Sequence, residues 1–173
     1  MKRLLVVLLL LLPLVGMAQR KYNVWIASAP VVSTTIQVTG YALNKLDSLA
    51  GLDFTKPYTA LSEVYILDSS NQKANFEVWL YRDRPDTTTL LSPFVLKNVD
   101  HAKVCGVVNV PTTAYYSGAA TPAMANGTVV LSPEMPVRLS TTRRYMYYKL
   151  VVRGTPTYTS GTALKLVFCF TQM

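Results

Sequence analysis

The residues that could carry catalysis are few and lack the partners that catalysis needs. The chain has a single histidine, His101, which lies between Asp100 and Lys103 in an expected loop. A general base must stand within hydrogen-bonding distance of the group that it deprotonates. A lone histidine beside an aspartate is far more often a solvated loop residue. No Gly-x-Ser-x-Gly motif supports a serine nucleophile, and no glycine-rich phosphate loop occurs.

The nine carboxylates do not form a recognisable catalytic or metal-binding pair either. Paired carboxylates can hydrolyse glycosides, but most of these nine are expected at turns or on the polar face of a strand. Asp83 and Asp86 are close enough in sequence to bind calcium together, yet the interleaved Arg82 and Arg84 oppose cation binding. We therefore predict that the protein is not an enzyme and has no metal site and no cofactor.

Aromatic residues indicate binding more strongly, since the chain has eleven tyrosines and two tryptophans. Tyr115 and Tyr116 precede the small residues 117–120, which predicts an exposed loop tip of the kind common in binding loops. Trp79 and Tyr81 share one face of an expected strand. If that face is outward, the two rings would stack on a sugar or a base. We favour burial for Trp79 and leave Tyr81 open.

A basic stretch follows later in the chain. Its five cationic side chains are Arg138, Arg143, Arg144, Lys149 and Arg153. On the strand after Tyr145, the side chains of Tyr147, Lys149 and Arg153 are expected on the face opposite the apolar one. Such a face could bind an anionic partner, although it is more often only solvated. Tyr145 and Tyr147 also fit the interleaved aromatics of nucleic-acid sites, but export argues against nucleic acid as the ligand.

The first eighteen residues predict a cleavable secretory signal peptide. Lys2 and Arg3 precede an apolar run over residues 4–15, and small residues at 16 and 18 mark a cleavage site after Ala18. The run is shorter than the roughly 20 residues that span a bilayer, so an uncleaved anchor is less favoured. We expect residues 19–173 to be exported to the periplasm, the cell surface or the medium, without a membrane span. The net charge of +8 for the whole chain favours acidic partners.

The exported part predicts a single all-β domain. Apolar and polar residues alternate with a period of two, and richness in Val, Thr and Tyr opposes long helices. The expected strands cover residues 22–27, 32–39, 63–67, 75–81, 104–110, 128–131, 137–139, 146–153 and 164–170. Turn chemistry is expected at 68–71, at hairpin distance between two strands, and at 82–86, 126–127 and 154–156. Only residues 41–52 predict a short helix. This spacing indicates a jelly-roll-like antiparallel β-sandwich of eight or nine strands.

Cys105 and Cys169 are the two cysteines of the chain. Export to an oxidising compartment permits a disulfide between them, which would close a loop of about 65 residues and contribute about 4 kcal/mol in the chain-entropy model. Two unpaired cysteines on neighbouring strands fit the sequence equally well. No Cys-x-x-Cys spacing indicates zinc.

From residue 61 to residue 170, the order of segments resembles a group of small tailed-phage proteins encoded among virion structural genes. Three runs carry the resemblance: SEVYILDSSNQKANFEVWLYRDRPD, SPFVLKNVDHAKVCGVVNV and RRYMYYKLVVRGTPTYTSGTALKLVF. The matching features are an aspartate turn at Asp68, an aromatic strand ending at Pro85, Asp100 before a central strand, and an aromatic-rich strand running into residues 154–158. The resemblance implies a structural role on the particle and transfers no catalytic residues. The signal peptide is a departure, because capsid-associated proteins of tailed phages assemble in the cytoplasm.

Two main hypotheses follow for the function. The first is a structural or assembly module that associates with itself or with other subunits through a flat apolar surface. The alternative is a secreted bacterial domain that binds a glycan, including an anionic one, or another cell-surface ligand. It would be monomeric, with exposed aromatic rings around Tyr115 and Tyr116. A third hypothesis, a hydrolase on a jelly-roll scaffold, requires two carboxylates that face each other in a groove.

Overall fold

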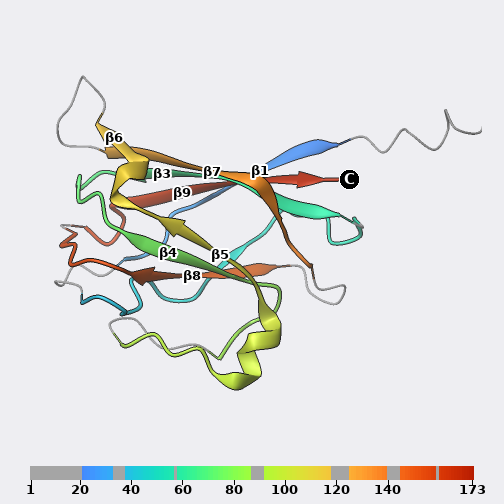
Figure 1. Ribbon diagram of the computed structural model, residues 1–173, viewed down its shortest axis with the longest axis horizontal. Helices are drawn as coiled ribbons and strands as arrows, with labels where there is room; N and C mark the ends of the chain where they lie inside the picture. Colours follow the sequence, from blue (N-terminus) through green and yellow to red (C-terminus); the bar gives the residue numbers. More distant parts are fainter. Residues whose placement is uncertain are drawn as a thin grey trace, which may run out of the picture.

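Two antiparallel sheets face each other in the computed structural model of the protein (Figure 1). The structure describes residues 21–32, 38–56, 58–86, 92–117, 125–139, 145–158 and 160–173. The expected signal peptide, most of the expected strand at 32–39, and Arg143 and Arg144 lie outside these residues. No helix in the described ranges is long and apolar enough to cross a membrane.

The described residues form nine strands and two short 3₁₀ helices. The strands are β1 (Tyr22–Ser28), β2 (Asp47–Leu49), β3 (Thr59–Asp68), β4 (Phe76–Tyr81), β5 (Val104–Val110), β6 (Tyr115–Ser117), β7 (Ala125–Pro136), β8 (Met146–Val152) and β9 (Leu164–Gln172). The helices are η1 (Asn98–Lys103) and η2 (Thr112–Ala114). The predicted all-β antiparallel fold is therefore confirmed. The segment 137–139, expected as a strand, instead continues from β7 as irregular chain.

The strand order shows how the two sheets depend on each other. One sheet has the order β1-β9-β3-β7-β6 and the other has the order β2-β8-β4-β5. The chain passes from one sheet to the other at every connection except β4–β5 and β6–β7. The first strand of the chain, β1, pairs along its whole length with the last strand, β9.

The core lies between the sheets and comes from the predicted alternation. In β9 the buried core side chains are those of Leu164, Leu166, Phe168 and Phe170. In β8 they are those of Met146, Tyr148, Leu150 and Val152. The rings of Tyr148 and Phe168 meet across the sandwich, with their centroids 5.2 Å apart. Burying such large aromatic side chains removes much apolar surface from water, and this packing is a main source of stability.

The short helix predicted over residues 41–52 is wrong. This segment runs beside β8 instead and contributes β2, which is paired with that strand. The N–H of Leu43 donates to the carbonyl of Leu150 at 2.9 Å, and the N–H of Leu150 donates to Asn44 Oδ1 at 2.8 Å. Long-range hydrogen bonds to a strand that would otherwise form an edge thus outweigh a weak local preference for helix.

Two of the predicted turns have a different role in the structure. Residues 68–71 do form a turn, in which the N–H of Asn71 donates to the carbonyl of Asp68, but it joins β3 to β4 in the opposite sheet and so is no hairpin. Asn126 and Gly127 lie inside β7. A Cβ atom on Gly127 would lie 3.1 Å from the carbonyl oxygen of Ala114. This glycine therefore serves a close approach between chain segments.

Asp68 and Asp100 have fully buried side chains that organise connections. Asp68 accepts hydrogen bonds from the N–H groups of Ser70 and Lys73. Asp100 accepts the N–H of Asp86 at 3.0 Å and the ammonium of Lys103 at 2.7 Å. Burial raises the pKa of Asp68. Burial acts in the same direction on Asp100, but its hydrogen bonds outweigh burial and hold its pKa below the usual 3.8.

We expect Asp100→Asn to lower the free energy of unfolding by about 1–3 kcal/mol at pH 7, because a charge-assisted acceptor is lost. A carboxyl whose pKa is lowered by folding stabilises the protein above its unfolded pKa, and this contribution disappears as pH falls through the folded pKa. The difference in unfolding free energy between the native protein and the variant should therefore be constant above about pH 5. It should shrink below pH 3.8. Urea unfolding at pH 7 and pH 3 measures it. Asp83→Asn, in the neighbouring turn and half-exposed, should change stability by no more than about 0.5 kcal/mol.

The two cysteines are free thiols in the structure and do not form a disulfide. Cys105 lies in β5 of the four-stranded sheet, whereas Cys169 lies in β9 of the five-stranded sheet. They are consequently not on neighbouring strands either. The Sγ of Cys105 lies 3.5 Å from the carbonyl oxygen of Arg138, and burial raises the pKa of its thiol to about 11.

Titration of the denatured, unreduced protein with a thiol reagent should give two thiols per chain. The folded protein should react much more slowly, because Cys169 is buried and the Cys105 thiol is largely protonated at neutral pH. Mass spectrometry after alkylation without reductant gives an independent count. A count of zero in the denatured protein would contradict this arrangement.

Candidate functional site

Part of the outer face of the four-stranded sheet, over β8 and β4, is covered by the protein's own chain. Residues 92–94 pair with residues 40–42, since the N–H of Ala42 donates to Ser92 and the N–H of Phe94 donates to Gly40. The Phe94 ring then packs on Trp79, with a centroid distance of 4.9 Å. Trp79 is thus half-buried, and Val151 in β8 is fully buried. The covering leaves little surface for a partner over β8 and Trp79, whereas Val107 in β5 remains 40% exposed.

The outer face of the five-stranded sheet is open and carries three large aromatic side chains. Trp25 in β1 is 53% exposed, Tyr65 in β3 is 36% exposed and Tyr116 in β6 is 60% exposed. Val130 in β7 is also exposed on this sheet. We call this surface the aromatic face. A cluster of exposed apolar side chains on a monomer commonly marks an interaction site.

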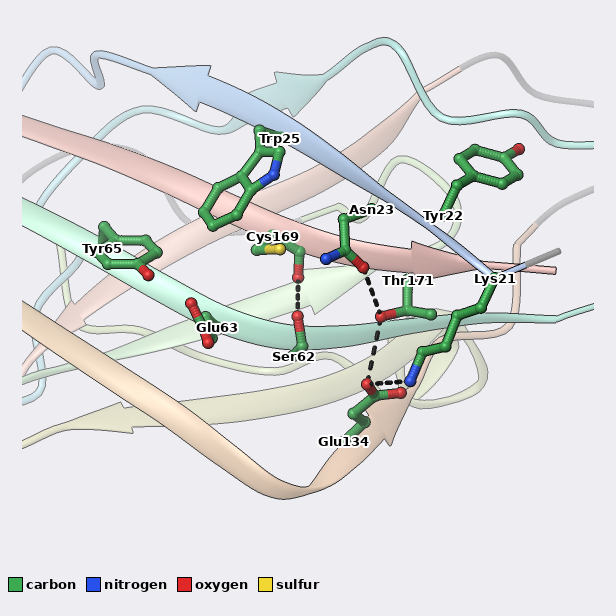
Figure 2. Close-up of a pocket in the computed structure, with 10 residues that line it drawn as sticks. All are labelled: Lys21, Tyr22, Asn23, Trp25, Ser62, Glu63, Tyr65, Glu134, Cys169 and Thr171. Atoms are coloured by element: carbon green, nitrogen blue, oxygen red, sulfur yellow. Dashed lines mark hydrogen bonds and ion pairs between the residues drawn. The ribbon is translucent and has the colours of Figure 1, made fainter.

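Trp25 and Tyr65 form a pair at one end of a hollow of this face (Figure 2). Their ring centroids are 5.5 Å apart and the ring planes are tilted by 37°. Cys169 is opposite Trp25 in the strand register and is almost completely buried. Its strand, β9, lies between the strands that carry the two rings. The small thiol side chain gives the larger rings on either side room to approach each other.

Polar groups surround the other end of this hollow, whose volume is about 560 Å³. Lys21 forms an ion pair with Glu134 at 2.8 Å, and Thr171 donates to the same Oε1 atom at 3.2 Å. Thr171 also lies 3.4 Å from Asn23 Oδ1. Figure 2 shows these four side chains in one connected group. Glu63 lies next to Tyr65, and a hydrogen bond to its carboxylate raises the tyrosine's pKa.

A second hollow of about 360 Å³ lies beyond Tyr65. Tyr65 and Tyr116 both line it, together with the polar residues Asn126 and Lys165. Because Tyr65 borders both hollows, they form one shallow groove across the aromatic face. Tyr116 lies in β6, two places from the strand of Tyr65 in the sheet order, so the two backbones are about 10 Å apart.

The tyrosines predicted to bind a ligand differ in their exposure to solvent. Tyr116 is exposed as expected, and it lines the groove. The exposure predicted for Tyr115 is wrong, since it is only 8% exposed and its hydroxyl donates to the carbonyl of Ala74 at 3.0 Å across the sandwich. Adjacent residues of a strand point to opposite faces, so only one of the two can be outward. Tyr81, which the sequence leaves open, is fully buried and cannot belong to a stacking platform.

The basic patch predicted on β8 is also largely absent. Lys149 is 1% exposed, because the covering segments described above lie over this face. Arg153 binds both carboxylate oxygens of Glu77, at 2.9 and 2.8 Å. Tyr145 is exposed and Tyr147 is half-buried, but without an accessible Lys149 these residues do not form a continuous cationic surface.

Sequence reasoning missed Trp25 and Tyr65, the centre of the groove. A signal was nevertheless present for Trp25, because it alternates with Val24 and Ile26 in a predicted strand. When these two side chains face the core, Trp25 must face outward.

The chemistry of the groove suits binding. Glu63 and Glu134 line the same hollow, but Glu134 Oε1 is already engaged by the ammonium of Lys21 and the hydroxyl of Thr171. In the described ranges no group of three or more His, Cys, Asp or Glu side chains is placed to hold a metal ion. Comparison with models of known protein families finds no match to this chain. Comparison with curated proteins finds no match either.

The buried ammonium of Lys149 predicts a pH-dependent stability. Burial lowers its pKa from 10.5 to about 8, so between these values the folded protein has released a proton that the unfolded chain still binds. Stability therefore rises with pH across this window. Relative to Lys149→Met, the native protein should gain about 1–3 kcal/mol between pH 7 and pH 10.5. Denaturant unfolding of both proteins at several pH values measures this gain.

The matched control is Arg153→Met, because a guanidinium stays charged throughout this range. The stability difference between this variant and the native protein should not follow the same pH profile. A flat profile for Lys149→Met would show that the ammonium does not titrate in this window.

Proposed function

We propose that the protein is a non-enzymatic structural module that is exported and assembles with copies of itself or with other subunits of a virus-like particle. The resemblance to tailed-phage virion proteins supports this role. The structural observation that carries the proposal is the open edge of the five-stranded sheet at β1, the first strand in the order of that sheet.

β1 has the properties of a strand that can pair with another chain. Its seven residues, YNVWIAS, include no charge and no proline, and it pairs with β9 along its whole length without a register shift. In the described residues no other element pairs with its free side. Natural edge strands are usually protected by charges, prolines, bulges or short length. β1 lacks these protections over roughly 23 Å of strand.

The other edges of the sandwich are better protected. β2 and β6 have only three residues each. β5 has a register shift against β4 between Leu80 and Tyr81, and Pro111 follows its last residue. A second copy that adds its own β1 about a two-fold axis would therefore extend the five-stranded sheet most easily at β1.

We also propose that the sandwich is a jelly roll with one added strand. Without β6, the two sheets have the orders β1-β9-β3-β7 and β2-β8-β4-β5, and the chain alternates between them as in the double Greek key of that fold. Jelly rolls recur in viral capsid proteins and in lectins. This fold analogy supports the assembly role without specifying a partner.

The alternative function is that of a secreted domain that binds a glycan or another cell-surface ligand. It is favoured by the exposed rings of the aromatic face. The two functions use different surfaces, because assembly would use the backbone edge of β1 and ligand binding would use the side chains of the groove.

Light scattering coupled to size-exclusion chromatography of the processed protein, over a range of salt concentrations, tests assembly. A defined oligomer that resists salt is expected. Ala27→Lys, which places a charge on the exposed edge of β1, should shift it towards monomer, because a charged side chain on an edge strand opposes pairing with another strand. Val130→Lys adds the same charge to the same sheet away from this edge and should leave the oligomer unchanged. A monomer at every salt concentration would exclude self-assembly.

A further inference from the structure

The groove on the aromatic face combines ring surfaces with hydrogen-bonding groups in a pattern that suits one class of ligand. Trp25 and Tyr65 touch each other at a tilt and still leave much of their ring surfaces in water. Tyr116 continues the row at the far end. An aromatic ring has a negative face that attracts polarised C–H bonds. A pyranose ring presents several such C–H bonds on one side.

The polar groups around the rings match the hydroxyl groups at the rim of a sugar. A hydroxyl can donate and accept, so it can pair with a carboxylate, an amide or an ammonium. The first hollow offers all three kinds of group in Glu63, Asn23 and Lys21, and the second offers Asn126 and Lys165. Among the described residues, Glu134 uses only its Oε1 atom in the ion pair with Lys21 and the hydrogen bond from Thr171. Its second oxygen remains available to a ligand.

The charges that line the groove indicate whether a neutral or an anionic ligand fits it. Lys21 and Lys165 are balanced by Glu63 and Glu134, although the whole chain has a net charge of +8. Sites for single-stranded nucleic acid combine stacking rings with a positively charged groove, and polyanionic glycans need a similar excess of cations. The balanced charges here therefore favour an uncharged ligand over the anionic partner that the composition suggested.

The shape of the groove favours a chain over a single small molecule. Pockets for small molecules usually enclose most of the ligand, whereas the two hollows here are shallow and open to solvent. They meet at Tyr65 and cross the sheet from β1 to β6. A ligand that contacts Trp25, Tyr65 and Tyr116 together must extend over several strands.

We propose that this groove binds a neutral saccharide chain, whose sugar rings stack on Trp25, Tyr65 and Tyr116 while their hydroxyls hydrogen-bond to Glu63, Asn23 and Glu134. The proposal deepens the alternative function given above, ligand binding at the surface, and it is independent of assembly through β1. A protein partner on the same face is the competing outcome of the test.

Affinity electrophoresis in gels that contain neutral polysaccharides tests the proposal. The probes are soluble polymers with glucose, mannose, galactose or xylose backbones, and dextran sulfate serves as the anionic comparison. The native protein should be retarded by at least one neutral polymer. Titration calorimetry with oligosaccharides of that polymer should then give an affinity that changes less than about twofold between 0.05 and 0.5 M salt, because no net charge is neutralised.

Variants assign the binding to the groove. Trp25→Ala should weaken saccharide binding about tenfold or more, as expected when one stacking platform is removed, and Trp25→Tyr should restore part of it. Tyr145→Ala removes an exposed ring outside the groove and should have no effect. Thermal unfolding of each variant checks that it is folded.

Several results would overturn the inference. These are no retardation by any neutral polymer, binding to dextran sulfate alone, or full saccharide binding by folded Trp25→Ala. If the native protein binds no saccharide and Trp25→Ala dissociates an oligomer, the aromatic face would instead be assigned to a protein partner. The monomeric Ala27→Lys variant separates the two proposals, because it should bind saccharide even when assembly is lost. An oligomer that binds no saccharide would leave assembly standing and reject this inference.

Discussion

The burial of side chains between the two sheets is the constraint on which the rest of the structure depends. Because the chain changes sheet at almost every connection, most strands that pair within a sheet are far apart in the sequence, and the buried contacts between the sheets hold them together. The contact of Tyr148 with Phe168 joins residues from different sheets. Asp68 and Asp100 then hold two of the connections from inside by accepting hydrogen bonds from backbone N–H groups of these segments. Their buried positions thus give both aspartates a role in the fold.

The two outer faces show how the same alternation produces different surfaces. On β8 the outward residues Lys149 and Val151 are covered by chain from elsewhere in the sequence, so their polarity does not decide their exposure. On β1 and β3 nothing among the described residues covers Trp25 and Tyr65, which remain partly in water. Leaving large rings exposed forgoes the free energy of burying them. The position of the covering segments therefore determines which face can bind a partner.

Most strands could be predicted from the sequence, since a period of two reports directly on a half-buried sheet. The pairing of strands could not, because it depends on contacts between distant residues. Residues 41–52 have a local pattern that allows a helix, yet their backbone groups bond to β8. Asn126 and Gly127 have turn chemistry, yet the glycine is needed where η2 approaches β7. The groove was harder still to foresee, because Trp25, Tyr65 and Tyr116 come together only when β1, β3 and β6 join one sheet.

The position of Trp25 links the two surfaces that we propose to be functional. It belongs to the strand with the open edge and also to the groove beside that edge. If a second copy pairs with β1, the two aromatic faces become continuous across the new strand pair, and two grooves lie next to each other. Stacking on a few rings gives modest affinity at a single site. Two linked sites raise the effective concentration of a polymeric ligand and can increase overall binding by a factor of 10² or more, roughly, without any new contact. Assembly would then be the means by which a shallow groove retains a long chain.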